Sequence, residues 1–538
     1  MDIKNKSLSR RAFLGVTGAT ATVAGLGLAG CGGGGDDTAA GSGTAASGGT
    51  EGGGTITAGS AYATQNYDPS STSSALSLGT NWHVVEGLYG IDYHDYSTFP
   101  ELATGDPTQV DDTTYDITLR EGAAFSDGNP VTPEDIIESF ARCTAEGNIY
   151  IPMLTPIASI EKKDDTTVTV KTTIPNFSLL KERLAIIRVV PASSTTEDMT
   201  AKPIGSGPWM YETISDDVVE MVPNPEYNGD HPAKDEKIHY DILVDATARI
   251  TAQQEGTTLV MEMATADAIE QLEASGCNVD TVQGFGTRFM MFNTKKAPWD
   301  NAKARQAVMY ALNYDQMITN AFAGLAAKPT CYLPENFPNY HEASVVYEYD
   351  ADKAKSLLEE AGVTPGEIEL CVTDNEQVTA MATQVKEDLD ALGFTVTINE
   401  QTSANTYTYI DGGGEYDLLL APGDPSCFGA DPDLLMNWWY GDNVWMQSRA
   451  RWSDSAEWAQ LTELMNKALT QEGDEQQETW NQCFDFIAEQ CVLYPVLQVQ
   501  TATGYWGDTP NGEGVSITGF AGIGTTGMSF IDCATVTA

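Results

Sequence analysis

Basic residues are scarce in this chain of 538 residues, which has 28 lysines and arginines but 77 aspartates and glutamates, a formal net charge of −49. Nucleic acids and anionic membrane surfaces would repel such a protein, and a polyanionic substrate is disfavoured for the same reason. We therefore expect no nucleic acid among its partners, whereas neutral, zwitterionic and cationic ligands stay open. Most of the carboxylates are expected to form a solvated surface that favours solubility.

Motifs typical of enzymes are also missing. The five histidines form no HExxH pattern or other close metal spacing, and the chain has no GxSxG and no glycine-rich loop ending in Lys-Ser or Lys-Thr. Residues 522–527 match GxGxxG, but a dinucleotide site needs a helix and a second strand after that turn, so we expect a surface turn. The sequence predicts no enzyme, no bound metal and no cofactor.

The nine cysteines show neither CxxC nor a zinc-binding spacing. The eight that follow Cys31 are an even number, which permits disulfides in an exported protein. Cys483 and Cys491 lie on one predicted helix, too far apart to bridge within it. The pairing of these cysteines stays open.

Long hydrophobic runs are absent, and the one apolar stretch of note lies near the start, at residues 15–30. It is too short and too rich in glycine to span a membrane. Basic residues precede it, including the pair Arg10-Arg11, which is typical of a twin-arginine export signal. The run ends in Leu28-Ala29-Gly30-Cys31, which resembles a bacterial lipobox. Residues 1–31 are therefore predicted to be an export signal, with Cys31 receiving a lipid that anchors the protein to the outer face of the cytoplasmic membrane, in an extracytoplasmic or periplasmic location.

Residues 32–54 consist almost entirely of Gly, Ser, Thr, Ala, Asp and Glu. They have no apolar surface to bury and predict a flexible linker. Folding is expected to begin near Thr55, and the remaining length suggests about three folding units.

Strands and helices alternate in the rest of the chain. Period-two patterns predict strands at residues 55–61, 115–119, 166–171, 368–373, 394–398 and 416–420. Helical spacing and capping residues predict helices at residues 133–143, 301–323, 350–361, 376–392, 456–469 and 474–491. The alternation predicts an α/β fold in which helices cover parallel or mixed sheets.

Four segments carry a resemblance to a known family. Residues 119–135 read LREGAAFSDGNPVTPED, which resembles the signature of the family 5 extracellular solute-binding proteins, the peptide- and nickel-binding receptors of ABC importers. In physical terms this segment is structural, because Asp127-Gly128 forms a turn and Thr132 caps a helix. The other similar segments, in family order, are residues 205–211 with 224–227, residues 292–313, and residues 349–362.

This resemblance implies a two-lobed, periplasmic-binding-protein-like fold of type II, with mixed sheets and a ligand cleft between lobes joined by two crossing strands. The crossings would fall near residues 288–293 and 494–500. Lobe I would comprise residues 55–287 with the C-terminal residues 497–538, and lobe II residues 288–496. Hinge closure around a ligand is a mode of motion known for this class.

The resemblance also implies ligand-binding residues. Peptide-binding relatives hold the ligand's α-ammonium with an aspartate in a loop that here spans residues 423–433, where Asp424 matches best and Asp431 is the second candidate. An Asx turn is the structural alternative for Asp424. Aromatic side chains expected near the cleft are Tyr62, Trp82, Trp209, Trp438 and Trp439, with core packing as their alternative role.

Dipeptide-binding relatives place an arginine after the strand at residues 368–373, whereas this chain reads Asp374-Asn375-Glu376-Gln377. The departure disfavours a dipeptide and leaves a longer peptide, whose C-terminus is held differently, or a non-peptide cation as ligand. The resemblance thus implies a monomeric peptide receptor that delivers its ligand to the permease of an ABC importer. A nickel chelate, haem or an oligosaccharide as ligand, or a peptide sensor not coupled to import, are the alternatives that stay open.

Overall fold

Three hydrophobic cores organise the computed structural model, which describes residues 50–92, 96–520 and 528–537. Core A is built from residues 56–85, 190–279 and 502–533, core B mainly from residues 78–189, and core C from residues 285–499. All three lie within one compact unit, whereas the length of the chain suggested about three folding units. We call cores A and B lobe I and core C lobe II. The export signal, Cys31 and residues 522–527 lie outside the described residues.

A mixed sheet forms the base of core A. Strand β2 (Thr55–Ser60) alternates exposed and buried positions, so that Ile56 and Ala58 point into the core. It pairs in parallel with β11 (Lys237–Ile242) and β12 (Val260–Met261), and β10 (Val218–Pro223) and β9 (Trp209–Ile214) extend the sheet in antiparallel fashion. The helices of this part are α1 (Ala75–Val84), α5 (Thr196–Ala201), α6 (Ala246–Glu255) and α7 (Ile269–Ala274).

His83 on α1 is fully buried in lobe I. Its Nε2 accepts a hydrogen bond of 2.8 Å from the Phe530 amide, so its Nδ1 donates to the Gly79 carbonyl at 2.9 Å. Burial lowers the pKa of this imidazole to about 4. The ring is therefore neutral and ties helix α1 to the C-terminal segment.

Core B contains an antiparallel sheet in the order β5 (Thr108–Asp111), β6 (Thr114–Thr118), β8 (Thr167–Thr172) and β7 (Ile157–Lys162). Helix α2 (Pro133–Cys143) begins as predicted, with Asp135 Oδ2 accepting from the Thr132 amide at 2.8 Å. The remaining elements are β3 (Tyr89–Ile91), β4 (Thr98–Pro100), α3 (Ile151–Leu154) and α4 (Leu180–Ile186).

Lobe II holds a second parallel group of strands, β15 (Glu367–Thr373), β16 (Thr395–Gln401) and β17 (Leu418–Gly423). Helix α11 (Glu376–Leu392) matches the prediction and ends at Gly393, whose φ of 109° favours glycine. The other helices are α8 (Ala302–Ala311), α9 (Tyr314–Phe322), α10 (Ala351–Glu360), α12 (Ser403–Asp411), α13 (Pro432–Tyr440), α14 (Ala456–Ala468) and α15 (Gly473–Gln490).

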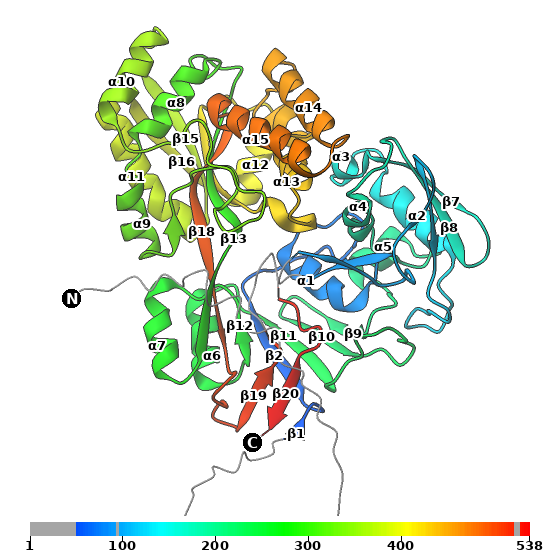
Figure 1. Ribbon diagram of the computed structural model, residues 1–538. Helices are drawn as coiled ribbons and strands as arrows, with labels where there is room; N and C mark the ends of the chain where they lie inside the picture. Colours follow the sequence, from blue (N-terminus) through cyan, green and yellow to red (C-terminus); the bar gives the residue numbers. More distant parts are fainter. Residues whose placement is uncertain (1–49, 93–95, 521–527, 538) are drawn as a thin grey trace, which may run out of the picture. The chain divides into compact units, whose positions relative to one another are not determined.

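Two long antiparallel strands link the sheets of the two lobes. Strands β13 (Asn278–Phe292) and β18 (Leu493–Tyr505) run side by side (Figure 1) and contain the two predicted crossings. β13 pairs with β17 of lobe II and β18 pairs with β12 of lobe I, which makes one sheet of 11 strands, with the short β14 (Ala326–Ala327) beside β18. The register of β13 against β18 breaks between Gln283 and Thr287, where residues 284–286 form a bulge.

Two local predictions were wrong. The helix expected over residues 301–323 is two helices, because Leu312 is extended and Asn313 caps α9 by accepting from the Gln316 amide. The linker expected to reach residue 54 is shorter, because β1 (Thr50–Glu51) pairs with β20 (Ala534–Thr537) beside β19 (Val515–Thr518). Backbone pairing needs no apolar side chain, so composition alone did not reveal that strand.

The seven cysteines whose side chains are described are buried free thiols: Cys143, Cys277, Cys331, Cys371, Cys483, Cys491 and Cys533. In the part of the chain that the structure describes, no helix combines the length and apolar character needed to cross a bilayer. Within the same ranges, no cluster of three or more His, Cys, Asp or Glu side chains is arranged to hold a metal.

Candidate functional site

Asp424 follows β17 directly and begins the 3₁₀ turn Pro425–Phe428. Its Oδ1 accepts from the Ser426 amide at 2.8 Å and from the Ser426 hydroxyl at 2.6 Å, the Asx geometry that was the alternative reading of this residue. Its Oδ2 faces the bulge of β13, since a Cβ built on Gly286 would lie 4.0 Å from it. One oxygen thus shapes the turn while the other is directed toward the strand that joins the lobes.

A glycine fixes the position of Asp424. A Cβ on Gly423 would lie 2.7 Å from Trp439 Cζ2, closer than real Cβ atoms approach another atom, and 3.0 Å from Phe289 Cε1, which is also tight. Trp439 is 1% exposed and packs against Phe289 and Tyr332. Trp439 is therefore a residue of core C whose ring lies against Gly423 and so fixes the position of the Asp424 turn.

Arg288 enters the same region from β13. It is 5% exposed and lies opposite Pro422 of β17 and Leu497 of β18. Its Nη1 donates to its neighbouring carbonyl, Thr287 O, at 3.0 Å, and its Nη2 donates to Gln377 Oε1. Its Nε has no hydrogen-bond partner among the described residues. Burial lowers the pKa of this guanidinium to about 10, and the charges of Tyr62 and Asp424 oppose that shift.

Lobe I contributes Tyr62, which follows β2. Its side chain is 40% exposed, and its segment is held by Glu262, whose Oε1 accepts from the Ala61 amide and the Ser60 hydroxyl, both at 2.8 Å. Desolvation raises the pKa of the Tyr62 phenol, and the carboxylates Glu262 and Asp424 raise it further, while Arg288 lowers it. Glu262 itself is 3% exposed, and burial raises its pKa.

Residues from both lobes and from the connecting strand therefore act on one another. Asp424 comes from lobe II, Tyr62 from lobe I and Arg288 from β13, and each affects the ionisation of another member. Tyr96 of lobe I also belongs to this group. Desolvation raises the pKa of its phenol, and the charge of Asp424 raises that pKa further. The Tyr96 ring packs against Phe285 of the bulge. We call Asp424, Arg288, Tyr62 and Tyr96 the junction cluster.

Asp431, the second candidate, has a different environment. It caps α13 by accepting from the Leu434 amide at 3.0 Å, and it pairs with Arg183 of α4 at 2.9 and 3.2 Å. Arg183 also binds Asp433 at 2.7 Å, and burial raises the pKa of Asp433 to about 6. This buried ion cluster joins lobe I to lobe II.

The other aromatic candidates belong to the hydrophobic cores. Trp82 is 8% exposed in core B, Trp209 is 2% exposed in core A, and Trp438 is half-buried between cores B and C. Of the aromatic candidates, the structure brings Tyr62 together with Asp424, whereas Trp439 is a core residue.

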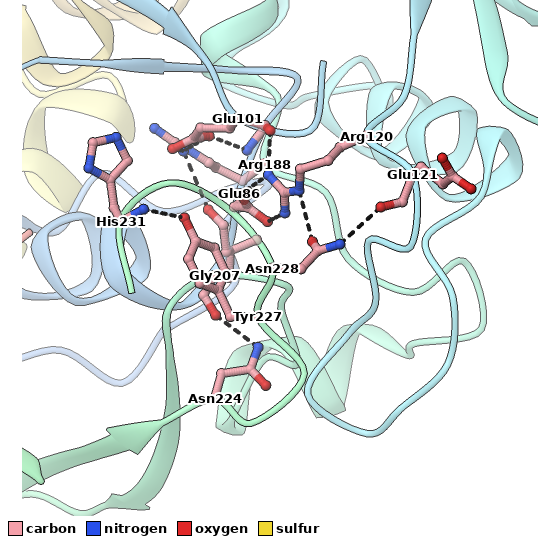
Figure 2. A network of polar contacts seen from close by, with 12 residues as sticks. Glu86, Glu101, Arg120, Glu121, Arg188, Gly207, Asn224, Tyr227, Asn228 and His231 are labelled. Carbon is pink, nitrogen blue, oxygen red and sulfur yellow. Dashed lines mark hydrogen bonds and ion pairs between the residues drawn. The ribbon is translucent and has the colours of Figure 1, made fainter. Parts of the chain in front are cut away.

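The signature segments form a separate polar network in lobe I (Figure 2). Arg120 binds both oxygens of Glu86 at 2.9 Å and donates from Nε to Asn228 Oδ1 at 2.9 Å. Arg188 binds Glu101 at 2.8 Å beside it. These contacts connect the loops around β3, β4 and β10, which agrees with a structural role for the signature.

The arrangement defines a class of protein: two α/β lobes joined by a pair of crossing strands, the architecture of the type II periplasmic binding proteins. The chain is similar to the binding protein AgaA of A. tumefaciens R10 in complex with agropinic acid, with a TM-score of 0.77 and 21% identity over 88% of this chain and 96% of that one. It is also similar to the dipeptide-binding protein of Pseudoalteromonas sp. SM9913 in complex with Met-Leu, with a TM-score of 0.74 and 20% identity over 89% of this chain and 99% of that one.

The family follows from the sequence comparison. Residues 98–447 match the model of the bacterial extracellular solute-binding proteins, family 5 (middle region), and the chain belongs to that family. It is 30% identical over 276 residues to a putative ABC transporter peptide-binding protein of Brucella ovis, a match that spans 49% of this chain and about half, 51%, of that protein. Members of the family bind solutes for transport and are not enzymes.

Sequence reasoning missed Arg288, Gln377 and Arg183. Arg288 could have been noticed, because it is the one basic residue in the largely apolar segment 285–292. No local sequence pattern marks Gln377 or Arg183, because their partners lie far away in the chain.

Proposed function

We propose that this protein is an extracytoplasmic lipoprotein of an ABC importer that captures peptides, oligopeptides rather than dipeptides, and delivers them to a membrane permease. The observation that carries the proposal is the junction cluster, in which Asp424 lies with aromatic side chains from the opposite lobe. A carboxylate in that position suits the α-ammonium of a peptide, because a charge-assisted hydrogen bond is about twice as strong as a neutral one.

The first experiment identifies the ligand. Residues 50–538 are purified and analysed by mass spectrometry under native and then denaturing conditions. A series of peptide masses that appears only after denaturation supports the proposal and gives the ligand length. A single non-peptide mass, such as a metal chelate or haem, would contradict it.

The second experiment tests Asp424. Asp424→Asn keeps an acceptor for Ser426 but removes the charge, and we expect peptide binding to weaken by about 1.5–3 kcal/mol, the usual contribution of a hydrogen bond to a charged group. Calorimetry compares each peptide with its N-acetylated form. Asp350→Asn is the matched control, since Asp350 caps α10 through the Lys353 amide at 2.8 Å in the same way. An Asp424→Asn protein that still prefers the free ammonium would refute the assignment.

Lipid attachment at Cys31 is proposed from the lipobox-like sequence. Cys31→Ala is expected to release the protein from the membrane fraction into the soluble one, as followed by immunoblotting. Retention in the membrane fraction would count against the anchor.

A further inference from the structure

The contact between α4 of lobe I and α13 of lobe II brings three carboxylates to one guanidinium. Arg183 of α4 is fully buried and binds Asp431 at 2.9 and 3.2 Å and Asp433 at 2.7 Å. Glu182, its neighbour on α4, is close enough to Asp431 for their charges to interact. We call these four residues the interlobe ion cluster. When all four are ionised, one positive charge faces three negative ones in a place from which water is largely excluded.

Hydrogen bonds leave this excess of negative charge uncompensated. Glu182 Oε2 is buried and has no hydrogen-bond partner in the part of the chain that the structure describes. Asp433 gains only the Asn437 side-chain amide, which donates to its Oδ1 at 2.9 Å, besides Arg183. Desolvation raises the pKa of Asp433 to about 6 although Arg183 opposes the shift, and desolvation followed by the charge of Asp431 raises the pKa of Glu182.

The cluster joins elements of different lobes. Helix α13 lies between them, since Leu434 belongs to core B whereas Leu435 and Met436 belong to core C. Hinge opening, the motion of this class of protein, would separate Arg183 and Glu182 from the two aspartates and admit water to all four side chains. Hydrated carboxyls have pKa values of about 4. The closed protein therefore binds more protons than the open one between about pH 4 and pH 6.

We propose that the interlobe ion cluster is a pH-dependent latch: closing of the lobes takes up a proton at this cluster, so that acidification favours the closed protein. At neutral pH the unpaired negative charge opposes closure, and the free energy of ligand binding has to overcome it. A proton on Asp433 or Glu182 removes this opposition while Asp431 stays paired with Arg183. The inference concerns the motion of the lobes and does not depend on which ligand the protein carries.

Other titratable groups lie on or beside the elements packed against α4 and α13. Burial keeps the Cys483 thiol and the Tyr89 phenol neutral, because it raises the pKa of the thiol to about 12 and that of the phenol further. The cations are Lys181, Arg449 and Lys467, of which Lys181 pairs with Asp106 and Arg449 with Asp411. The remaining carboxylates are Asp92, Glu101, Asp424, Glu457 and Glu463. Variants within the cluster leave all of these groups unchanged, so their titration is common to every protein compared.

Single-molecule FRET measures the open and closed populations without a ligand. Residues 48–538, which form one compact unit, are freed of ligand by unfolding and refolding. The dyes are attached at Val110→Cys in lobe I and Tyr349→Cys in lobe II, where the native side chains are 58% and 55% exposed. The background carries Cys427→Ser, and the seven cysteines whose side chains are described are buried. A salt concentration of about 0.5 M screens the general repulsion between two acidic lobes.

We expect the ratio of closed to open wild type to rise about 10-fold from pH 7.5 to pH 5, the change for one carboxyl whose pKa moves from about 4 to about 6 on closure. Asp433→Asn and Glu182→Gln imitate the protonated groups, so each should raise the ratio at pH 7.5 and reduce its dependence on pH. Arg183→Met leaves three carboxylates without a cation, and should lower the ratio at pH 7.5 and increase its dependence on pH.

Asp388→Asn is the matched control. Burial also raises the pKa of Asp388, but this carboxylate accepts from the Asn313 amide and from Gln384, both at 2.8 Å and both in lobe II. Opening of the lobes leaves these bonds intact, so the variant should behave like the wild type. Circular dichroism verifies that each variant is folded, and the two carboxamide variants decide the question if Arg183→Met does not fold.

Three outcomes would overturn the inference. The first is a wild-type ratio that is the same at both pH values. The second is a pH dependence that persists in the double variant Glu182→Gln/Asp433→Asn, because another group would then take up the proton. The third is a lower ratio in Asp433→Asn at pH 7.5, the result expected if Asp433 acts only as a salt-bridge partner of Arg183.

Discussion

Arg120→Met is expected to destabilise lobe I by about 3 kcal/mol, because it breaks a largely buried ion pair and leaves a carboxylate without its cation. The side chain of Glu86 is 5% exposed and that of Arg120 is 19% exposed, so solvent screens the pair weakly. Both Glu86 oxygens and Asn228 lose a hydrogen bond in the variant (Figure 2). The estimate is the lower end of the range for a fully buried pair, because Arg120 keeps some contact with water.

The pH dependence has a defined sign. Burial already raises the pKa of Glu86 in the folded protein, and loss of Arg120 raises it further. A carboxyl whose folded pKa lies above its unfolded value destabilises the fold fully above the folded pKa, and this destabilisation decreases as the pH falls below it and vanishes below the unfolded pKa. The difference between Arg120→Met and wild type should therefore be larger at pH 7.5 than at pH 5.

Urea unfolding followed by tryptophan fluorescence measures both effects. The double variant Arg120→Met/Glu86→Gln should recover much of the lost stability, since no charge is left unpaired. Lys163→Met is the control, because Lys163 pairs with Asp116 at 2.6 Å on the exposed surface, where little change is expected. A loss in Arg120→Met that does not depend on pH, with no recovery in the double variant, would refute the reasoning.

Two further predictions concern single residues. His83 has a folded pKa of about 4 against about 6.5 when unfolded, so its contribution of roughly 3 kcal/mol to the free energy of unfolding is complete above pH 6.5 and is lost as the pH falls to 4. In His83→Gln, the urea midpoint should therefore fall less steeply between pH 6.5 and pH 4 than in the wild type. An unchanged pH dependence of the midpoint contradicts the assignment. Gly423→Ala should lower the midpoint and weaken ligand binding, because its Cβ meets Trp439 at 2.7 Å. Gly366→Ala, whose Cβ meets no described atom within 4 Å, should do neither.

The elements with strong local signals could be predicted from the sequence. Helices α2 and α11 have the expected bounds, because Pro133 and Gly393 act within the segment they delimit. Strands β13 and β18 fall at the predicted crossings because the resemblance, rather than periodicity, placed them. The break between α8 and α9 was missed because Leu312 fits the apolar stripe of a continuous helix. A single capping residue, Asn313, is a weaker sequence signal than that stripe.

The candidate site was predictable only in part. Asp424 and Tyr62 were both expected at the cleft, and each belongs to the junction cluster, while their role in ligand binding stays a prediction. Arg288 and its partner Gln377 are separated by 89 positions, and no local pattern reports such a contact. Asp431 and Arg183 are 248 positions apart, so no sequence pattern indicates their pairing. The loop that suggested a ligand-binding role for Asp431 instead places it in an ion pair between the two lobes.

The pairing of β12 with β18, and of β1 with β20, has a consequence for the order in which the chain can fold. Strand β12 gains β18, and β1 gains β20 in a separate three-stranded sheet, only after residues 493–537 have been synthesised, although β2 begins at Thr55. Ala502, Trp506 and Phe530 belong to core A, so the other apolar side chains of that core stay without these partners until residues 502–530 have been synthesised. Contacts across such separations form slowly. The nascent chain therefore carries an incomplete hydrophobic core until residues 502–530, far along the chain from β2, have been synthesised.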